Sequence, residues 1–171
     1  RLSLTAYGEG KYAEASQLGS QGYELFEELG HRWGMGASLC RTGFAALGLG
    51  RRHEARTCFR QALKLATGVE HVPLILYSLA GIASLLAEEG KAAEALELFA
   101  FVEAHPQTPV TYLNITRRWS SDIETKLPQS AISAARVRGA TSKLETIVET
   151  FLRDPSGRVL FPTLGLDPNG C

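Results

Sequence analysis

The sequence predicts an all-α protein made of helix hairpins that recur with a 40-residue period. Two observations lead to this prediction. Gly10, Gly50 and Gly90 are evenly spaced along the chain, and each begins the phrase Gly-x-x-x-Glu-Ala. Between these glycines the apolar residues follow helical spacing, as they do from Ala55 to Leu63. A fixed period of this length is typical of stacked repeats, in which each unit buries its apolar face against its neighbours.

The composition is that of a soluble protein with one sizeable core. The chain has 171 residues, 44% of them hydrophobic, and its 18 basic and 18 acidic side chains cancel. We therefore expect no general attraction to nucleic acid or to an anionic membrane. No apolar run approaches the roughly 20 residues that a membrane-spanning helix needs. The three cysteines Cys40, Cys58 and Cys171 have no C-x-x-C spacing, which indicates reduced thiols and a cytoplasmic protein.

Each unit is predicted to be a helix A, a tight glycine turn and a helix B. In the second unit, helix A begins near Gly36 and passes through Leu47, and helix B resumes at Ala55 after the break at Gly50. The third unit repeats this arrangement one period later. Glycine suits these turns because it adopts left-handed backbone angles at little cost. The first unit lacks the start of its helix A, so we expect the chain to be part of a longer protein.

Small residues are predicted to mark the points where helices cross. Ala55 and Ala95 occupy equivalent positions of helix B, and each is followed four residues later by a phenylalanine, Phe59 or Phe99. We expect all four side chains to be buried, because a large side chain at the alanine positions would hold the helices apart. Gly19 stands where the first unit would have the corresponding phenylalanine.

After the third unit the 40-residue period stops, and the apolar pattern predicts three further helices. Repeat arrays need a terminal cap with one polar face, and these helices suit that role. The expected helices are residues 109–127, which Pro128 ends, residues 129–137, which stop near Gly139, and residues 143–153, which Ser142 caps with Glu145 as its capping-box partner. The chain is thus predicted to consist of three repeats over 1–105, the first incomplete, a helical cap over 106–153 and an irregular Pro/Gly-rich tail over 154–171.

The repeat pattern resembles the tetratricopeptide repeat. It has a small residue in helix A, a glycine turn, and in helix B an alanine followed by a large apolar residue, over about residues 1–105. The usual period of that repeat is about 34 residues, so the helices or turns here are longer. The resemblance implies a right-handed superhelix of antiparallel helix hairpins, TPR-like with a 40-residue period, closed by a helical C-terminal cap.

Two segments resemble a narrower group, the C-terminal sensor regions of bacterial STAND/NB-ARC-type signal-transduction ATPases and transcriptional activators. They are residues 25–34, which bridge two units, and residues 127–145, which are similar to the segment that closes such arrays. This resemblance implies a cytoplasmic bacterial regulatory protein that acts in signal transduction.

No motif predicts catalysis, a metal or a cofactor. Gly48 and Gly50 do not meet the Walker or dinucleotide-binding spacing, and no predicted strand precedes them. His31 and His71 are separated by one full period, so we expect them at equivalent turns, too far apart to share a zinc ion. No G-x-S-x-G nucleophile motif is present. The sequence therefore predicts a binding protein and no enzyme.

The predicted binding site is the inner face of the array, which helix A lines in tetratricopeptide proteins. This face is apolar and aromatic, and it lacks the Lys/Asn set with which chaperone-docking repeats hold a C-terminal carboxylate. Two alternatives stay open: the groove binds a partner, or the cap or the tail fills it. The groove residues expected from the helical wheel are Leu4, Tyr7, Ala37, Cys40, Phe44, Leu47, Tyr77, Ser84 and Ala87.

From these observations we expect a non-catalytic protein-interaction or scaffold module. Its partner would be a protein, a peptide or another domain of the same polypeptide. The alternative function is an effector-sensing domain of a transcriptional activator, with a small molecule in the concave groove. No binding to membranes or nucleic acid is expected, because the basic row of the second helix B is predicted to be solvated and balanced by nearby acids. The row is Arg52, Arg56, Arg60 and Lys64, and the acids are Glu24, Glu27 and Glu28.

Overall fold

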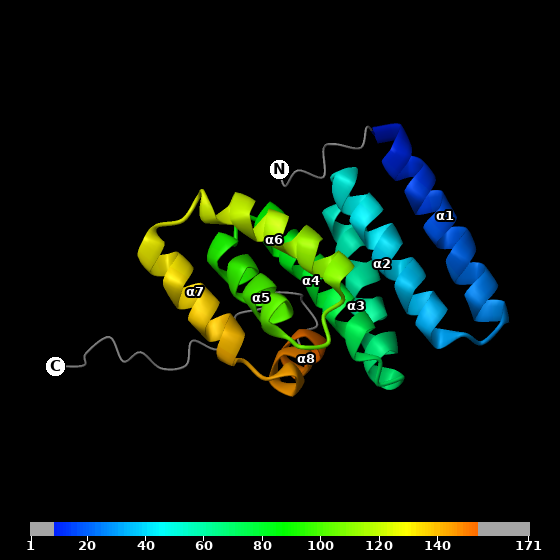
Figure 1. Ribbon diagram of the computed structural model, residues 1–171. Coiled ribbons are helices and arrows are strands. Elements are labelled where there is room, and N and C mark those ends of the chain that lie inside the picture. The colour runs from blue at the N-terminus through cyan, green and yellow to red at the C-terminus, as the bar shows by residue number, and fades with distance from the viewer. Residues whose placement is uncertain (1–8, 154–171) are drawn as a thin grey trace.

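A computed structural model describes the backbone of residues 9–153 and the side chains of residues 11–153. Within this range the chain forms eight α-helices and no β-strand, so the predicted all-α class is confirmed (Figure 1). The helices are α1 (Glu9–Glu28), α2 (Arg32–Gly48), α3 (Arg52–Gly68), α4 (Val72–Glu88), α5 (Ala92–Ala104), α6 (Val110–Glu124), α7 (Gln129–Thr141) and α8 (Leu144–Arg153).

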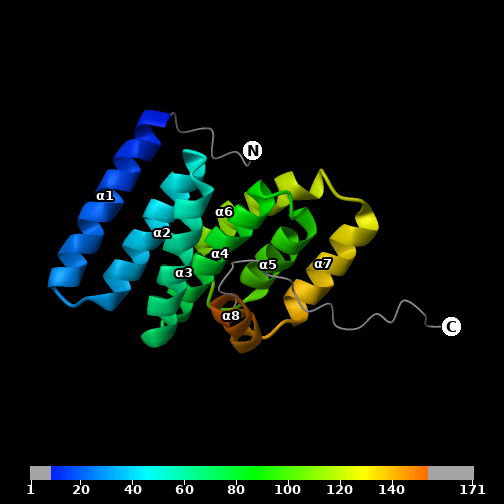
Figure 2. The same ribbon diagram turned by 180° about the vertical axis from the view of Figure 1, so that it is seen from behind.

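The helices follow one another across the molecule. In both views α1 lies at one edge and α7 at the other, with α2 to α5 between them (Figures 1 and 2). Each helix from α1 to α5 packs against the next in sequence, and α7 packs against α5. α6 contacts α4 and α5, while α8 contacts α3. α7 therefore extends the row beyond α5, whereas α6 and α8 return to helices that precede them.

The helix bounds recur with the period that the glycine phrases predict. α2 and α4 begin at positions 32 and 72 and end at positions 48 and 88, while α3 and α5 begin at 52 and 92. Each of these pairs shows the same 40-residue offset. The predicted breaks at Gly50 and Gly90 are confirmed. Gly10 differs, because it lies within α1 and not between two helices. The chain before Glu9 lies outside the described residues.

Four turns end helices in the same way, at the evenly spaced positions 30, 50, 70 and 90. Gly30, Gly50, Glu70 and Gly90 all have positive φ, between 51° and 82°. The amide of Gly50 donates to the carbonyl three residues earlier at 2.9 Å, and the next amide donates to the carbonyl five residues earlier at 2.8 Å. The other three turns repeat this pair, which is the Schellman motif. The turns of the structure thus recur at half the spacing of the 40-residue repeat. The sequence displays only the 40-residue spacing, because Glu70 stands at a turn position where the other three turns have glycine.

His31 and His71 occupy equivalent helix N-caps, as expected of polar turn residues. Nδ1 of each imidazole accepts a hydrogen bond of 3.1 Å from a backbone amide three residues later, that of Gly34 or Leu74. These bonds satisfy an amide in the first turn, which has no carbonyl partner within its own helix. Trp33 packs between the two rings, with centroid distances of 5.8 and 5.9 Å. The two histidines therefore have a structural role.

The core lies at the helix crossings, where large and small residues meet. Phe59 and Phe99 are fully buried, and so are the alanines four residues before them, which confirms that prediction. Phe59 fits against a glycine on each of two neighbouring helices. A Cβ at Gly43 would lie 2.7 Å from its ring, and a Cβ at Gly81 would overlap the ring. These glycines are therefore required by close packing within the helices and not by a turn.

Two predicted helix ends in the C-terminal region are wrong, and the first is that of α6, which ends at Glu124 and not at residue 127. α7 does not stop near Gly139 but continues to Thr141. Gly139 instead faces α5, where a Cβ would overlap the carbonyl oxygen of Glu97 and come within 2.9 Å of the amide nitrogen of Phe101. The residue thus lets two helices pack closely. From the sequence alone, a glycine with this role looks like a helix stop.

The predicted capping box at Ser142 is also wrong. Ser142 ends α7, and its hydroxyl donates a 2.7 Å hydrogen bond back to the carbonyl of Arg138. The next helix begins at Leu144, and its first-turn bond runs from the amide of Ile147 to the carbonyl of Lys143. Only Ser142 and Lys143 separate α7 from α8, so the serine closes the first helix instead of opening the second.

Ion pairs fasten α7 to the helices beside it. Arg136 reaches Glu103 of α5 at 3.0 Å and Glu124 of α6 at 2.6 Å. Arg138 reaches Glu97 of α5 at 2.7 Å, and the Glu97 side chain is buried. Breaking a pair with a buried member is costly, because it leaves a charge out of water without a partner. The position of α7 is therefore set by charge as well as by apolar contact.

The basic row of α3 is balanced by a different helix from the one predicted. Arg56 forms an ion pair with Glu89, and Nη2 of Arg52 lies 3.8 Å from a carboxylate oxygen of Glu88. Both acids lie at the end of α4 and not on α1, where the sequence analysis placed the balancing glutamates. Arg56 and Arg60 are half-buried, so the row is only partly solvated. The correction follows from packing, because the end of α4 lies beside the start of α3.

Candidate functional site: a pocket between four helices

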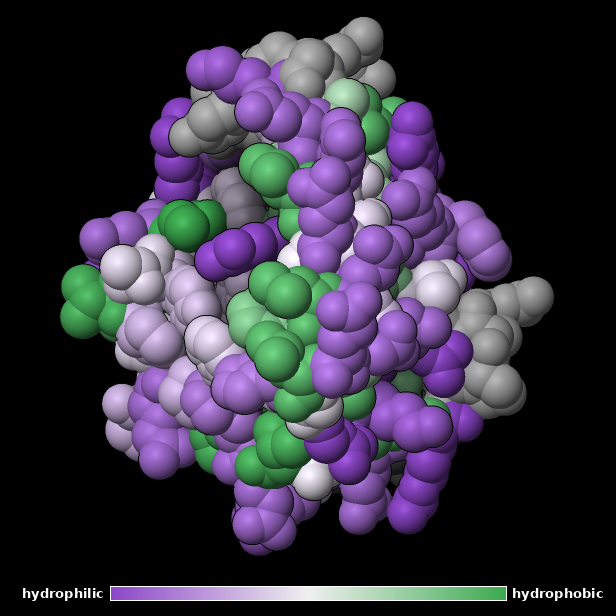
Figure 3. Space-filling view, turned by 90° about the vertical axis from the view of Figure 1, so that its right-hand side faces the viewer, coloured by the Kyte–Doolittle hydropathy of each residue, from purple (hydrophilic) through white to green (hydrophobic). Residues whose placement is uncertain are grey.

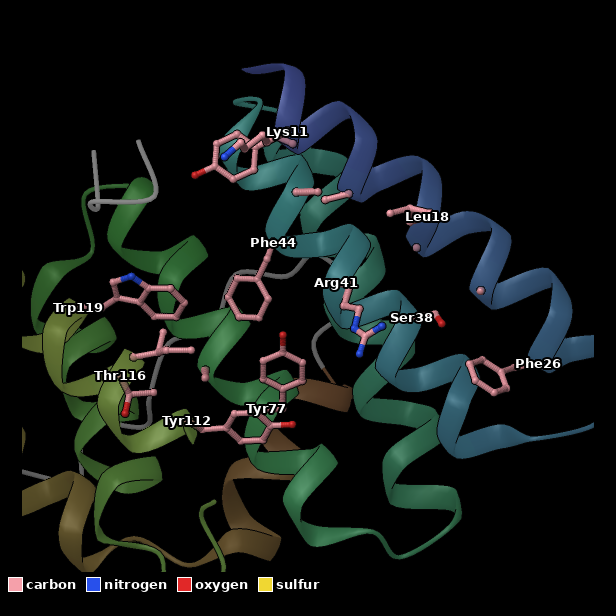
Figure 4. Close-up of a pocket in the computed structure, with 17 residues that line it drawn as sticks. Lys11, Leu18, Phe26, Ser38, Arg41, Phe44, Tyr77, Tyr112, Thr116 and Trp119 are labelled. Atoms are coloured by element: carbon pink, nitrogen blue, oxygen red, sulfur yellow. The ribbon is translucent and has the colours of Figure 1, made fainter. Parts of the chain in front are cut away.

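A cavity of about 460 Å³ lies between α1, α2, α4 and α6 (Figure 4). We call it the central pocket. Side chains from helices far apart in the sequence meet around it. Its lining is Lys11, Tyr12, Ala15, Leu18, Gly19, Gly22 and Phe26 of α1, Ser38, Arg41, Phe44 and Ala45 of α2, Tyr77 and Ala80 of α4, and Tyr112, Ile115, Thr116 and Trp119 of α6.

The wall that α1 contributes includes several small residues. A Cβ at Gly19 would overlap the hydroxyl oxygen of Thr42, and a Cβ at Gly22 would lie 2.9 Å from that of Ser38. Helix α1 therefore lies unusually close to α2. The equivalent positions of Gly19 in the later units are the buried Phe59 and Phe99. The large side chain that fills the core of those units is missing here, beside the central pocket.

Aromatic rings form the opposite wall and touch one another in a continuous cluster. Phe44 lies 5.3 Å from Tyr77 and 5.4 Å from Trp119, measured between ring centroids. Tyr77 stacks on Tyr112 at 4.5 Å, with the ring planes 9° apart. Phe44 also meets the fully buried Phe59 at 5.0 Å. The wall is therefore anchored in the core, which favours a pocket formed before any ligand arrives.

The charged residues that line the central pocket are both cations. They are Lys11 and Arg41, and among residues 11–153 no aspartate or glutamate lines the pocket. Both are exposed, so each charge lies where solvent reaches. In Figure 4 the guanidinium of Arg41 extends from α2 on the side of the pocket where Tyr77 lies. A lining whose charged groups are all positive makes the pocket attractive to an anion.

The hydroxyl groups of Tyr77 and Tyr112 add polar atoms to the aromatic wall. Burial raises the pKa of Tyr77, and the charge of Arg41 lowers it by less. The same two causes act on the pKa of Tyr112, again with a net rise. Both phenols therefore keep their protons at neutral pH, and each is available as a hydrogen-bond donor.

The structure brings only part of the predicted groove into the central pocket. Phe44 and Tyr77 line it. Cys40 and Ser84 are fully buried in the core, and Leu47 is buried as well. The remaining predicted residues are Ala37 and Ala87, which are half-buried outside the lining, and Leu4 and Tyr7, which lie outside the described residues.

Of the two sequence-based alternatives for the groove, the filling of the groove by the predicted cap applies only in part. Trp119 and Tyr112 of α6 cover one side of it, so the predicted cap does occupy part of the inner face. A cavity nevertheless remains between that helix and α1. Tyr112 and Trp119 are seven residues apart in the sequence, a spacing that places them on one face of a helix. Nothing in that spacing indicated which earlier helix the face would meet.

Two of the three cysteines, Cys40 and Cys58, have the properties of core residues, and Cys171 lies outside the described residues. The Cys40 sulfur lies 3.4 Å from the Ser78 hydroxyl, and burial raises the pKa of this thiol to about 12 despite that contact. Burial also raises the pKa of Cys58 to about 11. Neither is a thiolate at neutral pH, and the thiolate is the reactive form.

Residues 9–153 contain neither a metal-ion cluster nor a membrane-spanning helix. Among these residues no group of three or more His, Cys, Asp or Glu side chains could hold a metal ion. No helix in the same range is long and apolar enough to cross a membrane.

Comparison of the chain with protein-family models, with curated proteins and with solved structures finds no match. The function is therefore argued from the central pocket, because a fold by itself does not determine what a protein binds.

Proposed function

We propose that this chain is a non-catalytic ligand-sensing module that binds a small, largely apolar molecule in the central pocket. The observation that supports the proposal is the cavity of about 460 Å³ with an aromatic wall. Small-molecule sites commonly measure about 300–1,000 Å³ and combine apolar walls with a few polar groups. An open, flat groove would instead have favoured a peptide or a helix. Of the two functions that the sequence suggests, the effector-sensing one therefore has the better support.

The proposed architecture is a TPR-like right-handed superhelix of antiparallel helix hairpins, with α6 to α8 as its cap. The 40-residue offset of the helix bounds and the four equivalent turns support it. In this arrangement α2 and α4 are the inner helices, and the central pocket lies on their inner face. The resemblance to bacterial signal-transducing regulators makes a cytoplasmic regulatory protein the context that we propose.

A ligand in the central pocket would connect parts of the chain that are otherwise far apart. It would touch α1 at one edge of the row and α6, which packs on α4 and α5, together with α2 and α4. Binding stabilises whichever arrangement of helices contacts the ligand best. An occupied pocket would therefore favour one position of α1 relative to the C-terminal helices. This is how a helical array without an active site could report the presence of a small molecule.

A neutral fluorescent probe tests the proposal. Prodan, an uncharged naphthalene dye, should bind the chain with an emission shift that saturates at one site. Ala15→Phe places a ring inside the central pocket and should weaken this binding about tenfold or more, which corresponds to about 1.4 kcal/mol or more. Ala13→Phe is the matched control, because Ala13 is exposed on the same helix and does not line the pocket. Equal binding by both variants would refute the pocket as the site.

A protein-interaction function is a second candidate, supported by a separate surface. Leu25 of α1 and Leu29 just after it are 55% and 68% exposed. Figure 3 views the molecule from the side on which α1 lies, and apolar surface interrupts the mostly hydrophilic face there. Exposed apolar groups of this kind often mark contact sites. Replacement of Leu25 and Leu29 by serine should abolish partner binding and leave Prodan binding unchanged, since neither residue lines the central pocket.

A further inference from the structure

The charge of the central pocket limits the kind of molecule that fits it. Within the part of the chain that the structure describes, its lining contains Lys11 and Arg41 and no carboxylate. Arg41 differs from the paired arginines of the protein. Arg56 and Arg136 each meet a glutamate, whereas no ion pair joins Arg41 to an acid within residues 11–153. A cation beside an apolar cavity, with no acidic partner among these residues, can pair with an acidic group of a ligand.

The position of Arg41 suits contact with the end of a bound molecule. Ser38, Arg41 and Phe44 follow one another at intervals of three residues, so they share the face of α2 that lines the central pocket. Burial raises the pKa of Tyr77 and of Tyr112, and the positive charge of Arg41 lowers each pKa by less, so both hydroxyl groups stay protonated. A guanidinium and nearby phenols together offer several N–H and O–H donors at one side of an otherwise aromatic space.

We propose that the central pocket binds a small organic acid, with its carboxylate at Arg41 and its apolar body against the aromatic wall. This rests on the proposed function, which concerns the same pocket. A carboxylate fits a single arginine because the planar guanidinium can donate two parallel hydrogen bonds to its two oxygens. A doubly charged phosphate would call for more cations than Arg41 and Lys11, which lies on a different helix. The apolar body of the acid makes the apolar contacts with Phe44 and Trp119 that water cannot make.

Three eight-carbon molecules that differ only in their head group test this proposal. Octanoate, 1-octanol and octylammonium are titrated at neutral pH into a Trp33→Phe background, in which Trp119 is the sole tryptophan and reports on the central pocket. Octanoate should bind about tenfold or more tighter than 1-octanol, and octylammonium should bind worst. High salt should reduce the preference for octanoate, because it screens the charge of an exposed arginine.

Arg41→Gln is the decisive variant, with Arg118→Gln as its matched control. Both remove one exposed positive charge, but Arg118 lies on α6 outside the pocket lining. Arg41→Gln should bring octanoate to the affinity of 1-octanol, whereas Arg118→Gln should keep the preference. Equal loss in both variants would overturn the proposal, because the effect would then be one of net charge.

The outcomes also separate this inference from the proposed function. If 1-octanol binds as well as octanoate to the unmodified protein, the pocket takes small apolar molecules and the carboxylate proposal is wrong. If none of the three molecules binds, both proposals fail. If only a peptide with a free C-terminal carboxylate binds at Arg41, the small-acid proposal fails and the protein-interaction function is favoured.

Discussion

The close contact between α5 and α7 at Gly139 makes a quantitative prediction for Gly139→Ala. An added Cβ would overlap the carbonyl oxygen of Glu97, and it would lie 2.7 Å from the Cβ of Ala100 and 2.9 Å from the amide nitrogen of Phe101. Two of these three atoms belong to the backbone of α5, so no side chain can rotate away to relieve the contact. The two helices must separate instead.

Two opposing terms set the magnitude of this change. Alanine is favoured over glycine inside a helix by about 1 kcal/mol. Forcing an extra methyl group into a packed contact costs about 1–3 kcal/mol, and the backbone contacts here place the cost near the upper end. The separation also lengthens the ion pair between Arg138 and Glu97, whose carboxylate is buried. We expect a net loss of about 2 kcal/mol in the free energy of unfolding.

Urea denaturation followed by circular dichroism measures this loss. With a slope of about 1–3 kcal/mol per molar urea, the midpoint should fall by roughly 1 M. Gly68→Ala is the control, because the nearest atom to its added Cβ is the end of the flexible Arg32 side chain, at 3.1 Å. That variant should be neutral or slightly stabilising. A Gly139→Ala midpoint equal to or above that of the unmodified protein would refute the close approach of α5 and α7.

Two further predictions concern the core and the basic row of α3. Phe99→Ala should lower the free energy of unfolding by about 3–5 kcal/mol, because Phe99 is fully buried; an unchanged denaturation midpoint would contradict its place in the core. Arg56→Glu should lower the free energy of unfolding by about 1 kcal/mol, because it places a second acidic side chain next to Glu89 at a partly exposed site. Glu89→Arg in the same chain should recover most of that loss, because it restores a pair of opposite charges. No recovery in the double variant would show that the pair contributes nothing.

The sequence by itself determined the all-α class and the 40-residue period with which the helices recur. The recurrence of Gly50 and Gly90 predicts the breaks correctly, because a left-handed turn residue is a local requirement that glycine meets best. The buried positions of Phe59 and Phe99 also follow from local spacing, since residues three and four apart share one helix face. The glycine turns and the buried phenylalanine positions both depend on residues that are close in the sequence, so the sequence alone is enough to predict them.

Only the tertiary structure decided where the helices meet, and therefore where the pocket lies. Gly139 was predicted to end a helix because the sequence does not reveal that α5 passes within contact distance of it. Arg56 was matched with the wrong acids for the same reason. The central pocket depends on Arg41 and Trp119, which lie far apart in the sequence and belong to no shared motif. Local spacing determines which face of each helix is apolar, but the packing of one helix on another determines which faces enclose a cavity.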